Sequence, residues 1–282
     1  MIIDFHTHTF PSELAFKTIP KLAQAGNIVP YTDGTKHQLI QSMKESAVDY
    51  SVLLPIATRP AQTEKLNRLA AETNQTTEET GLLSFGTLHP DNEDYKEQIR
   101  QIADYGIKGV KLHPCYQDLE MDDIRMLRIV YCIQEYGLIT IFHAGYDVGF
   151  PGCRAAMPER CLHLIEEIHP RRLVLAHMGG WGCWDEVSEK LAGLDVWFDT
   201  AFSIGEIRSY TPNTRSREES QMLTEAQLRK LVRKHGADRV LFGTDSPWGS
   251  QQETLEKLEQ CGFTEKELKM IKGENAARLL NL

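Results

Sequence analysis

Two histidines near the start of the chain, His6 and His8 in the segment DFHTH, have the spacing of a metal-binding pair. Side chains two residues apart on a β-strand point to the same side, so both imidazoles can face one ion. Such a pair alone is weak evidence, but three more polar groups, His143, His177 and Asp245, each follow a separate apolar run. Four imidazoles and a carboxylate suit a divalent cation of borderline softness. We therefore predict a bound divalent metal, most simply one zinc ion, with manganese as the alternative.

The apolar runs are the elements that must bring these polar groups together. Being short and rich in Val, Ile, Leu and Phe, they are predicted to be buried parallel strands. They span residues 2–5, 51–55, 82–88, 109–112, 138–142, 173–176, 196–198 and 240–243. Helix-compatible stretches alternate with or follow them, at residues 63–79, 95–105, 122–136, 158–168, 184–191, 225–235, 251–260 and 265–280. Strand followed by helix about eight times predicts an α/β fold, a (β/α)8 TIM barrel in which residues 1–282 form one domain.

In such a barrel the loops that follow the strands meet at one rim and carry the active site. The least regular stretches, residues 11–34, 146–157 and 203–221, all follow strands and are predicted to be substrate loops. The candidate substrate-binding residues near the rim are Arg59, His89, Tyr146, Arg154 and Trp181. An arginine there could bind a substrate carboxylate through two hydrogen bonds. The alternative is that the arginines are solvated loop charges and that Trp181 is a packing residue.

The motifs DFHTH, FHAG, AHMGG and GTDSPW, each at the end of an expected strand, resemble those of the amidohydrolase superfamily. The similarity spans essentially the whole chain, particularly to the amidohydrolase-related (amidohydrolase 2) branch, which includes aminocarboxymuconate-semialdehyde decarboxylase-like proteins. The resemblance implies that His6, His8 and His143 bind the metal. It also implies that Asp245 binds the metal or takes a proton from the metal-bound water, and that His177 polarises water or substrate.

The strand segment GVKLHP leaves the number of metal ions open. Lys111 and His113 have the same parity there, so both can point into the barrel. Some superfamily members carry a carboxylated lysine in this context that bridges two metals, and with such a bridge His177 would bind a second ion. Alternatively, Lys111 binds an anionic group of the substrate, or His113 only forms a hydrogen bond at the rim. We expect one essential metal and keep the second as the alternative.

The expected activity follows from the metal, since a bound divalent cation can lower the pKa of its water from about 15.7 to roughly 7. We expect a hydrolase that acts on an amide, lactone or ester of a small, carboxylated substrate. A metal-dependent non-oxidative decarboxylase, a carbon–carbon lyase, is the alternative, because the same metal shell in this branch also removes carboxylates from unsaturated or aromatic acids. A purely structural zinc site is disfavoured because its ligands usually lie on short loops, whereas these come from strands scattered along the chain.

The composition is that of an ordinary globular protein and argues against some classes of partner. A formal net charge of −9 leaves no excess of Lys and Arg to neutralise phosphates, which argues against a nucleic-acid partner. No apolar run approaches the roughly 18 residues of a membrane span, and the N-terminus lacks the pattern of a signal peptide. We therefore expect a cytoplasmic protein with a small-molecule substrate and no membrane partner, and leave a homodimer open.

The cysteines are expected to play no part in the chemistry. Six cysteines in 282 residues are too few for a disulfide framework, and none of them forms a CxxC pair. We therefore expect reduced thiols.

Overall fold

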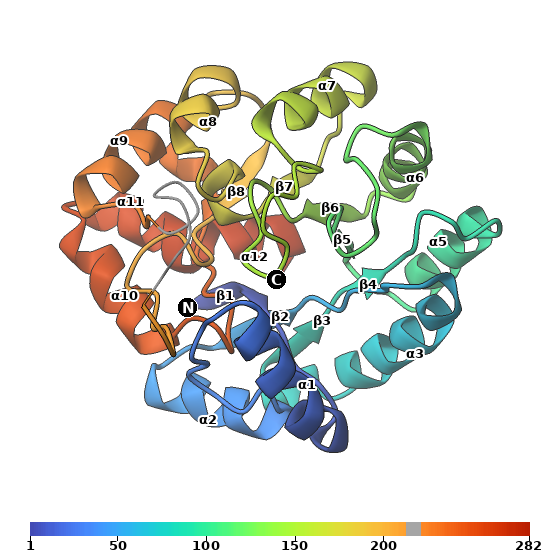
Figure 1. The fold of residues 1–282 in the computed structure, drawn as a ribbon, viewed down its shortest axis with the longest axis horizontal. Helices are drawn as coiled ribbons and strands as arrows, with labels where there is room; N and C mark the ends of the chain where they lie inside the picture. The colour runs from blue at the N-terminus through green and yellow to red at the C-terminus, as the bar shows by residue number, and fades with distance from the viewer. Residues whose placement is uncertain (213–220) are drawn as a thin grey trace.

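Short parallel strands run in sequence order around the middle of the molecule in the computed structural model, which describes residues 1–212 and 221–282 (Figure 1). The strands are β1 (Ile3–Thr7), β2 (Tyr50–Leu53), β3 (Leu82–Ser84), β4 (Gly86–Thr87), β5 (Gly109–Leu112), β6 (Ile139–Phe142), β7 (Leu173–Leu175), β8 (Trp197–Asp199) and β9 (Val240–Leu241). All eight predicted strand regions are confirmed. The run at residues 82–88 forms both β3 and β4, which are interrupted at Phe85.

Backbone hydrogen bonds join the two ends of this strand series. Strands β1 to β3 pair in order, as do β4 to β9, and every pair is parallel. The Phe5 N–H donates to the Phe242 carbonyl at 2.8 Å, and the Asp245 N–H donates to the His6 carbonyl at 2.8 Å. These bonds connect β1 to the segment that follows β9. The fold is therefore the predicted TIM barrel.

Helices surround the strands, and the longer ones bury an apolar stripe against them (Figure 1). They include α2 (Lys36–Glu45), α3 (Thr63–Asn74), α4 (Thr77–Thr80), α5 (Tyr95–Asp104), α6 (Ile124–Glu135), α7 (Pro158–Ile168), α8 (Trp184–Lys190), α9 (Glu225–His235), α10 (Gln251–Gln260), α11 (Glu265–Lys269) and α12 (Asn275–Leu280). In α6 the buried positions Met126, Ile129, Val130 and Ile133 follow the helical repeat. No helix in the described ranges is long and apolar enough to cross a membrane.

The prediction that residues 11–34 are irregular is wrong. Helix α1 (Ser12–Ala25) occupies more than half of this stretch and buries Ala15, Ile19 and Ala23, which are four residues apart. Two small alanines give a weak apolar signal, and Pro20 inside the helix suggests a break because it lacks a backbone N–H. Residues 146–157 contain no helix or strand, as predicted. Of the third predicted loop, 203–221, residues 213–220 lie outside the described residues.

The barrel interior is apolar at one end and polar at the other. Ile3, Phe5, Phe85, Ile139 and Ile141 belong to the cluster that fills it. Gly109 fits beneath Phe85 because it has no side chain: a Cβ there would lie 2.4 Å from the Phe85 ring. Farther along the strands the inward positions become polar. The packed interior thus provides a rigid floor beneath these polar residues.

The buried carboxylate of Asp4 connects β1 to the segment after β9 and to α10. Asp4 accepts hydrogen bonds from the Thr244 N–H at 3.0 Å, the Thr244 hydroxyl at 2.6 Å and the Gln251 side-chain amide at 2.9 Å. Asp4→Asn replaces one acceptor with a donor that faces other donors, so we expect it to lower the free energy of unfolding by about 1–3 kcal/mol. Urea unfolding measures this change.

The matched control is Asp195→Asn, since Asp195 is 95% exposed and its carboxylate lies 3.8 Å from the Arg239 guanidinium, too far for a strong ion pair. The control should change stability by no more than about 0.5 kcal/mol. Equal stability of the two variants would show that Asp4 does not help to close the barrel.

Candidate metal centre

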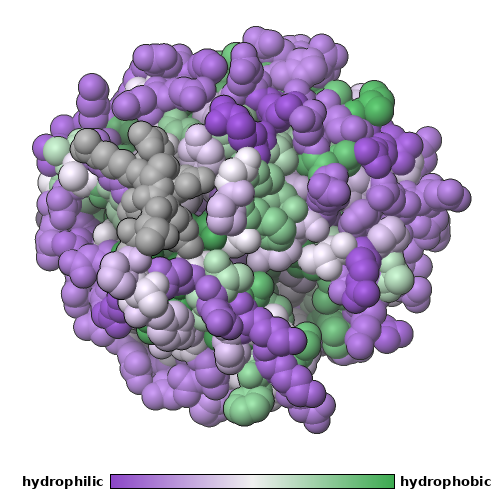
Figure 2. Space-filling model, in the orientation of Figure 1, coloured by the Kyte–Doolittle hydropathy of each residue, from purple (hydrophilic) through white to green (hydrophobic). Residues whose placement is uncertain are grey.

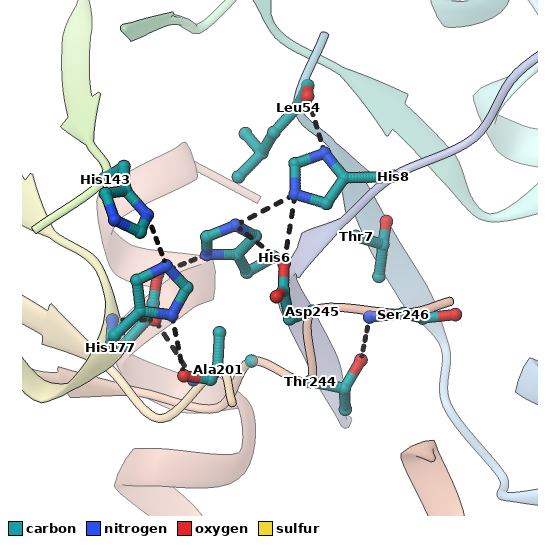
Figure 3. A network of polar contacts seen from close by, with 12 residues as sticks. His6, Thr7, His8, Leu54, His143, His177, Ala201, Thr244, Asp245 and Ser246 are labelled. Atoms are coloured by element: carbon teal, nitrogen blue, oxygen red, sulfur yellow. Dashed lines mark hydrogen bonds and ion pairs between the residues drawn. The ribbon is translucent and has the colours of Figure 1, made fainter. Parts of the chain in front are cut away.

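Three acceptor atoms, one each from His6, His8 and Asp245, converge at the polar end of the barrel (Figure 3). The His6 Nε2 lies 3.2 Å from the His8 Nε2, and the Asp245 Oδ1 lies 3.4 Å and 3.0 Å from these two nitrogens. In a tetrahedral site with bonds of 2.0–2.1 Å, neighbouring ligand atoms are about 3.3 Å apart. The three atoms, which we call the metal triangle, therefore already have the spacing of ligands around one ion.

Outward hydrogen bonds fix which nitrogen of each histidine faces the metal triangle. His6 Nδ1 donates to the Asp199 carboxylate at 2.8 Å, and His8 Nδ1 donates to the Leu54 carbonyl at 2.9 Å. Each Nε2 then presents a lone pair to the triangle. Burial, together with the nearby Lys111 charge, holds the pKa of His6 well below its usual value, so this ring is neutral. The converging lone pairs are therefore arranged to bind a cation.

His143 and His177 bring a second pair of acceptor nitrogens close together. His143 Nε2 donates to the Tyr146 carbonyl at 3.0 Å, and His177 Nδ1 donates to the Ala201 carbonyl at 2.9 Å. The remaining nitrogens, His143 Nδ1 and His177 Nε2, face each other at 3.0 Å. The structure thus brings three of the four predicted ligands together in the metal triangle and places the fourth, His143, against His177.

The turns that carry His177 and Asp245 have an unusual backbone. The φ angles of His177, Met178 and Asp245 are +58°, +54° and +64°, in the left-handed region that costs side chains of this kind about 1–3 kcal/mol each. Local contacts oppose this cost: the Asp199 Oδ1 accepts from the His177 N–H at 2.9 Å, and the Trp184 indole donates to the His177 carbonyl at 3.0 Å. Asp199 thus orients both the His6 ring and the backbone of His177.

Asp245 and Lys111 are ionisable side chains that both lie beside His6. Burial alone would raise the pKa of Asp245, but the adjacent His8 and His6 rings hold it below its usual value, so Asp245 is a carboxylate. Lys111 is 1% exposed, and its Nζ lies 3.5 Å from the His6 Nε2. Burial lowers the pKa of Lys111 to about 8, against the pull of Asp199 and Asp245.

A cavity opens above the metal triangle, on the face of the molecule where hydrophobic residues gather near the middle (Figure 2). It is lined by His6, His8, Ile56, Lys111, His113, Tyr116, His143, Tyr146, Asp147, Val148, His177, Trp181, Phe202 and Asp245. Among the predicted substrate residues, Tyr146 and Trp181 line this cavity. Arg154 lies behind Tyr146 and donates to its hydroxyl at 3.2 Å.

The other two predicted substrate residues, Arg59 and His89, do not line the cavity. Arg59 is exposed at the start of a short 3-10 turn, Pro60–Gln62. His89 turns toward its own loop, where its Nδ1 accepts from the Asp91 N–H at 3.2 Å.

Sequence reasoning did not identify Asp147 and Tyr116, which both line the cavity. The Asp147 Oδ2 lies 3.2 Å from the His113 Nε2, and the Tyr116 ring packs edge-on against His113 with 4.6 Å between centroids. His113, His143 and Asp147 form a further group that could hold a metal. The sequence did contain a signal, since Asp147 is an acid four residues after the strand-ending His143.

The expectation that all cysteines are reduced is wrong for two of them. Cys115 and Cys153 form a disulfide whose Cα atoms are 6.3 Å apart. Their separation of 38 residues resembles no local motif. They meet because the loops after β5 and β6 are neighbours at the rim, as the pairing of these strands requires.

Comparisons with known proteins agree with this architecture. A family model described as "Amidohydrolase" matches residues 3–282. No curated protein matches the chain in sequence.

Several solved structures share the fold. An uncharacterised TIM-barrel protein from Bordetella bronchiseptica has a TM-score of 0.73 at 16% identity, covering 99% of this chain and 98% of that one. A 2,6-dihydroxybenzoate decarboxylase from Rhizobium has a TM-score of 0.66 at 15% identity, covering 99% and 98%. A 5-carboxyvanillate decarboxylase from Novosphingobium aromaticivorans, solved with bound manganese, has a TM-score of 0.68 at 12% identity, covering 100% and 97%.

The metal triangle predicts that the purified chain retains a divalent ion and that His8→Ala loses most of it. The substitution removes one of three converging donors while the His6 and Asp245 donors remain. Elemental analysis after gel filtration should find roughly one ion per chain in the wild type.

His163→Ala is the control, because His163 is a half-exposed histidine that pairs with Asp122 away from the cavity. This variant should keep the ion. A metal content near two ions, with added mass on the Lys111 amine, would instead support the bridged alternative, and active wild-type protein without metal would contradict the site.

Proposed function

Because the chain belongs to the amidohydrolase family over residues 3–282, we propose that it is a metal-dependent decarboxylase that removes a carboxylate from a small unsaturated or aromatic acid without oxidation. The sequence alone places hydrolysis first and decarboxylation second. Two of the similar structures described above are decarboxylases, which favours the alternative.

The observation that carries this proposal is the buried Lys111 amine at the floor of the cavity. Its Nζ lies 3.5 Å from the His6 Nε2 and forms no ion pair with a carboxylate in the described residues. Leaving a buried ammonium unpaired is costly unless a ligand supplies the opposite charge. A substrate that is an anion, and that remains one as carbon dioxide leaves, supplies that charge throughout the reaction.

The donors of the metal triangle fit a divalent cation, with His6, His8 and Asp245 as its ligands and His143 close by. Zinc is the first choice for two imidazoles and a carboxylate, and manganese is the alternative. When bound, such an ion holds oxygen atoms of the substrate and draws electron density from them.

The chain's own residues then handle charge and one proton. As the bond to the carboxylate breaks, its electron pair moves into the conjugated part of the substrate, where the Lys111 ammonium stabilises it. His177 lines the cavity, its Nδ1 is held by the Ala201 carbonyl, and its Nε2 lies 3.0 Å from the His143 Nδ1. We assign to this Nε2 the uptake of a proton from solvent and the delivery of that proton to the substrate carbon that has lost carbon dioxide. Tyr146, Trp181 and Phe202 pack together and give the cavity an aromatic lining.

Hydrolysis of an amide, lactone or ester is the second candidate, and one observation favours it. Asp245 is held in its carboxylate form and reaches the cavity, with 14% of its side chain exposed. A carboxylate in this place could accept a proton from an attacking water.

The two candidates give different products, so the test is to identify what is released. Protein loaded with zinc or with manganese would be incubated with 2,6-dihydroxybenzoate, 5-carboxyvanillate, other enol acids, lactones and amides, in water enriched in oxygen-18. Decarboxylation releases carbon dioxide and adds one solvent proton to carbon. Oxygen-18 in a product carboxylate, without carbon dioxide, would establish hydrolysis and reject the proposal.

His177→Asn separates the proposed proton transfer from metal binding. Since His177 is outside the metal triangle, the variant should keep the ion and lose turnover by about 10²- to 10⁴-fold, the usual scale for a positioned acid or base. Turnover of the substrate found above, measured beside metal content, checks this expectation.

The control for this variant is His89→Asn, which changes a buried histidine that does not line the cavity. Its turnover should stay near the wild-type value. Loss of metal from His177→Asn would make His177 a ligand of a second ion, and unchanged turnover would remove it from the chemistry.

A further inference from the structure

The disulfide between Cys115 and Cys153 joins two loops that line the cavity. We propose that these cysteines form a reversible thiol–disulfide site that reacts with dithiols: its oxidised form fixes the loop at residues 146–153 against the cavity, and its reduced form releases this loop. A difference in substrate binding between the oxidised and reduced forms would rest on the proposed function. The thiol–disulfide site itself and the release of the loop do not rest on it.

The disulfide is one of several links between the loops after β5 and β6, which are also joined by the hydrogen bond from the Met121 N–H to the Ala155 carbonyl at 2.8 Å. His113 and Asp147 are joined at 3.2 Å, and the rings of Tyr116 and Phe150 meet edge-on with centroids 4.7 Å apart. The covalent bond between Cys115 and Cys153 joins the same two loops. His113 and Tyr116 line the cavity from one loop, and Tyr146, Asp147 and Val148 line it from the other. The bond therefore limits the separation of two walls of the site.

The loop after β6 depends on such links because it has no regular structure of its own. Backbone hydrogen bonds anchor its ends: Gly145 to Ala156 at 2.7 Å, and Tyr146 to Trp181 at 3.0 Å. Farther along, two backbone bonds are local turns, from Phe150 to the Asp147 carbonyl and from Cys153 to the Phe150 carbonyl. A segment with local bonds of this kind opens at low free energy unless a cross-link restrains it.

The two sulfur atoms differ in solvent exposure, and this difference decides which of them a dithiol attacks. Cys153 is partly exposed, whereas Cys115 is 7% exposed. A thiolate of the dithiol attacks the Cys153 sulfur, the bond between the cysteines breaks, and Cys115 leaves as a thiolate that takes up a proton. The second thiol of the dithiol then attacks the mixed disulfide and releases Cys153. Two electrons and two protons pass to the protein, the dithiol becomes a disulfide, and an oxidised dithiol reverses the exchange.

The experiment compares backbone hydrogen exchange of the full chain, loaded with metal and without substrate, in oxidised and reduced form. Dithiothreitol is the reductant, its cyclic disulfide is the oxidant, and the thiols are counted after each treatment. We expect four free thiols in the oxidised protein and six in the reduced one. Amides of residues 146–153 should exchange roughly tenfold faster after reduction, while the strands stay protected.

Two variants complete the test. Cys115→Ser with Cys153→Ser should exchange like the reduced protein under both conditions. Cys132→Ser, which removes a thiol of α6 outside both loops, should respond like the wild type apart from one thiol fewer. Equal exchange in the oxidised and reduced wild type, or six free thiols after oxidation, overturns the proposal. Because neither readout uses substrate, a failed search for decarboxylase activity does not affect the outcome of this test.

Discussion

The structure is organised around three acceptor atoms that face one another with no proton between them. The Nε2 atoms of His6 and His8 and the Oδ1 of Asp245 lie 3.0–3.4 Å apart. Such atoms repel each other, so the protein must hold them in place. It does so by bonding each Nδ1 outward, to Asp199 and to the Leu54 carbonyl. The resulting arrangement is complementary to a cation, as expected of a preformed metal site.

Asp199 connects this site to the rest of the rim. One of its oxygens accepts from His6, and the other accepts from the backbone N–H groups of His177 and Ala201. A single buried carboxylate therefore orients a metal ligand and stabilises the strained turn that carries His177. Asp199, Asp245 and Asp147 also offset the effect of burial on Lys111, which alone would neutralise its amine more completely. The site is thus an electrostatic unit whose parts come from different strands.

The sequence predicted the barrel because each strand is a continuous apolar run and most of the helices have a clear stripe. It also predicted which histidines lie at the rim, because strand ends set their position. Helix α1 was missed since Pro20 and two small alanines obscure its stripe. The Cys115–Cys153 bond was missed for a different reason: it depends on which irregular loops meet in space, and local sequence patterns do not encode that.

The central claim is that the metal triangle binds a divalent ion, and crystallography at the metal's absorption edge tests it directly. Crystals of the chain loaded with zinc, and separately with manganese, would be measured for anomalous scattering. We predict one strong peak about 2.0–2.2 Å from His6 Nε2, His8 Nε2 and Asp245 Oδ1. An anomalous peak only at His113 and Asp147, or no peak in fully loaded crystals, would contradict the claim.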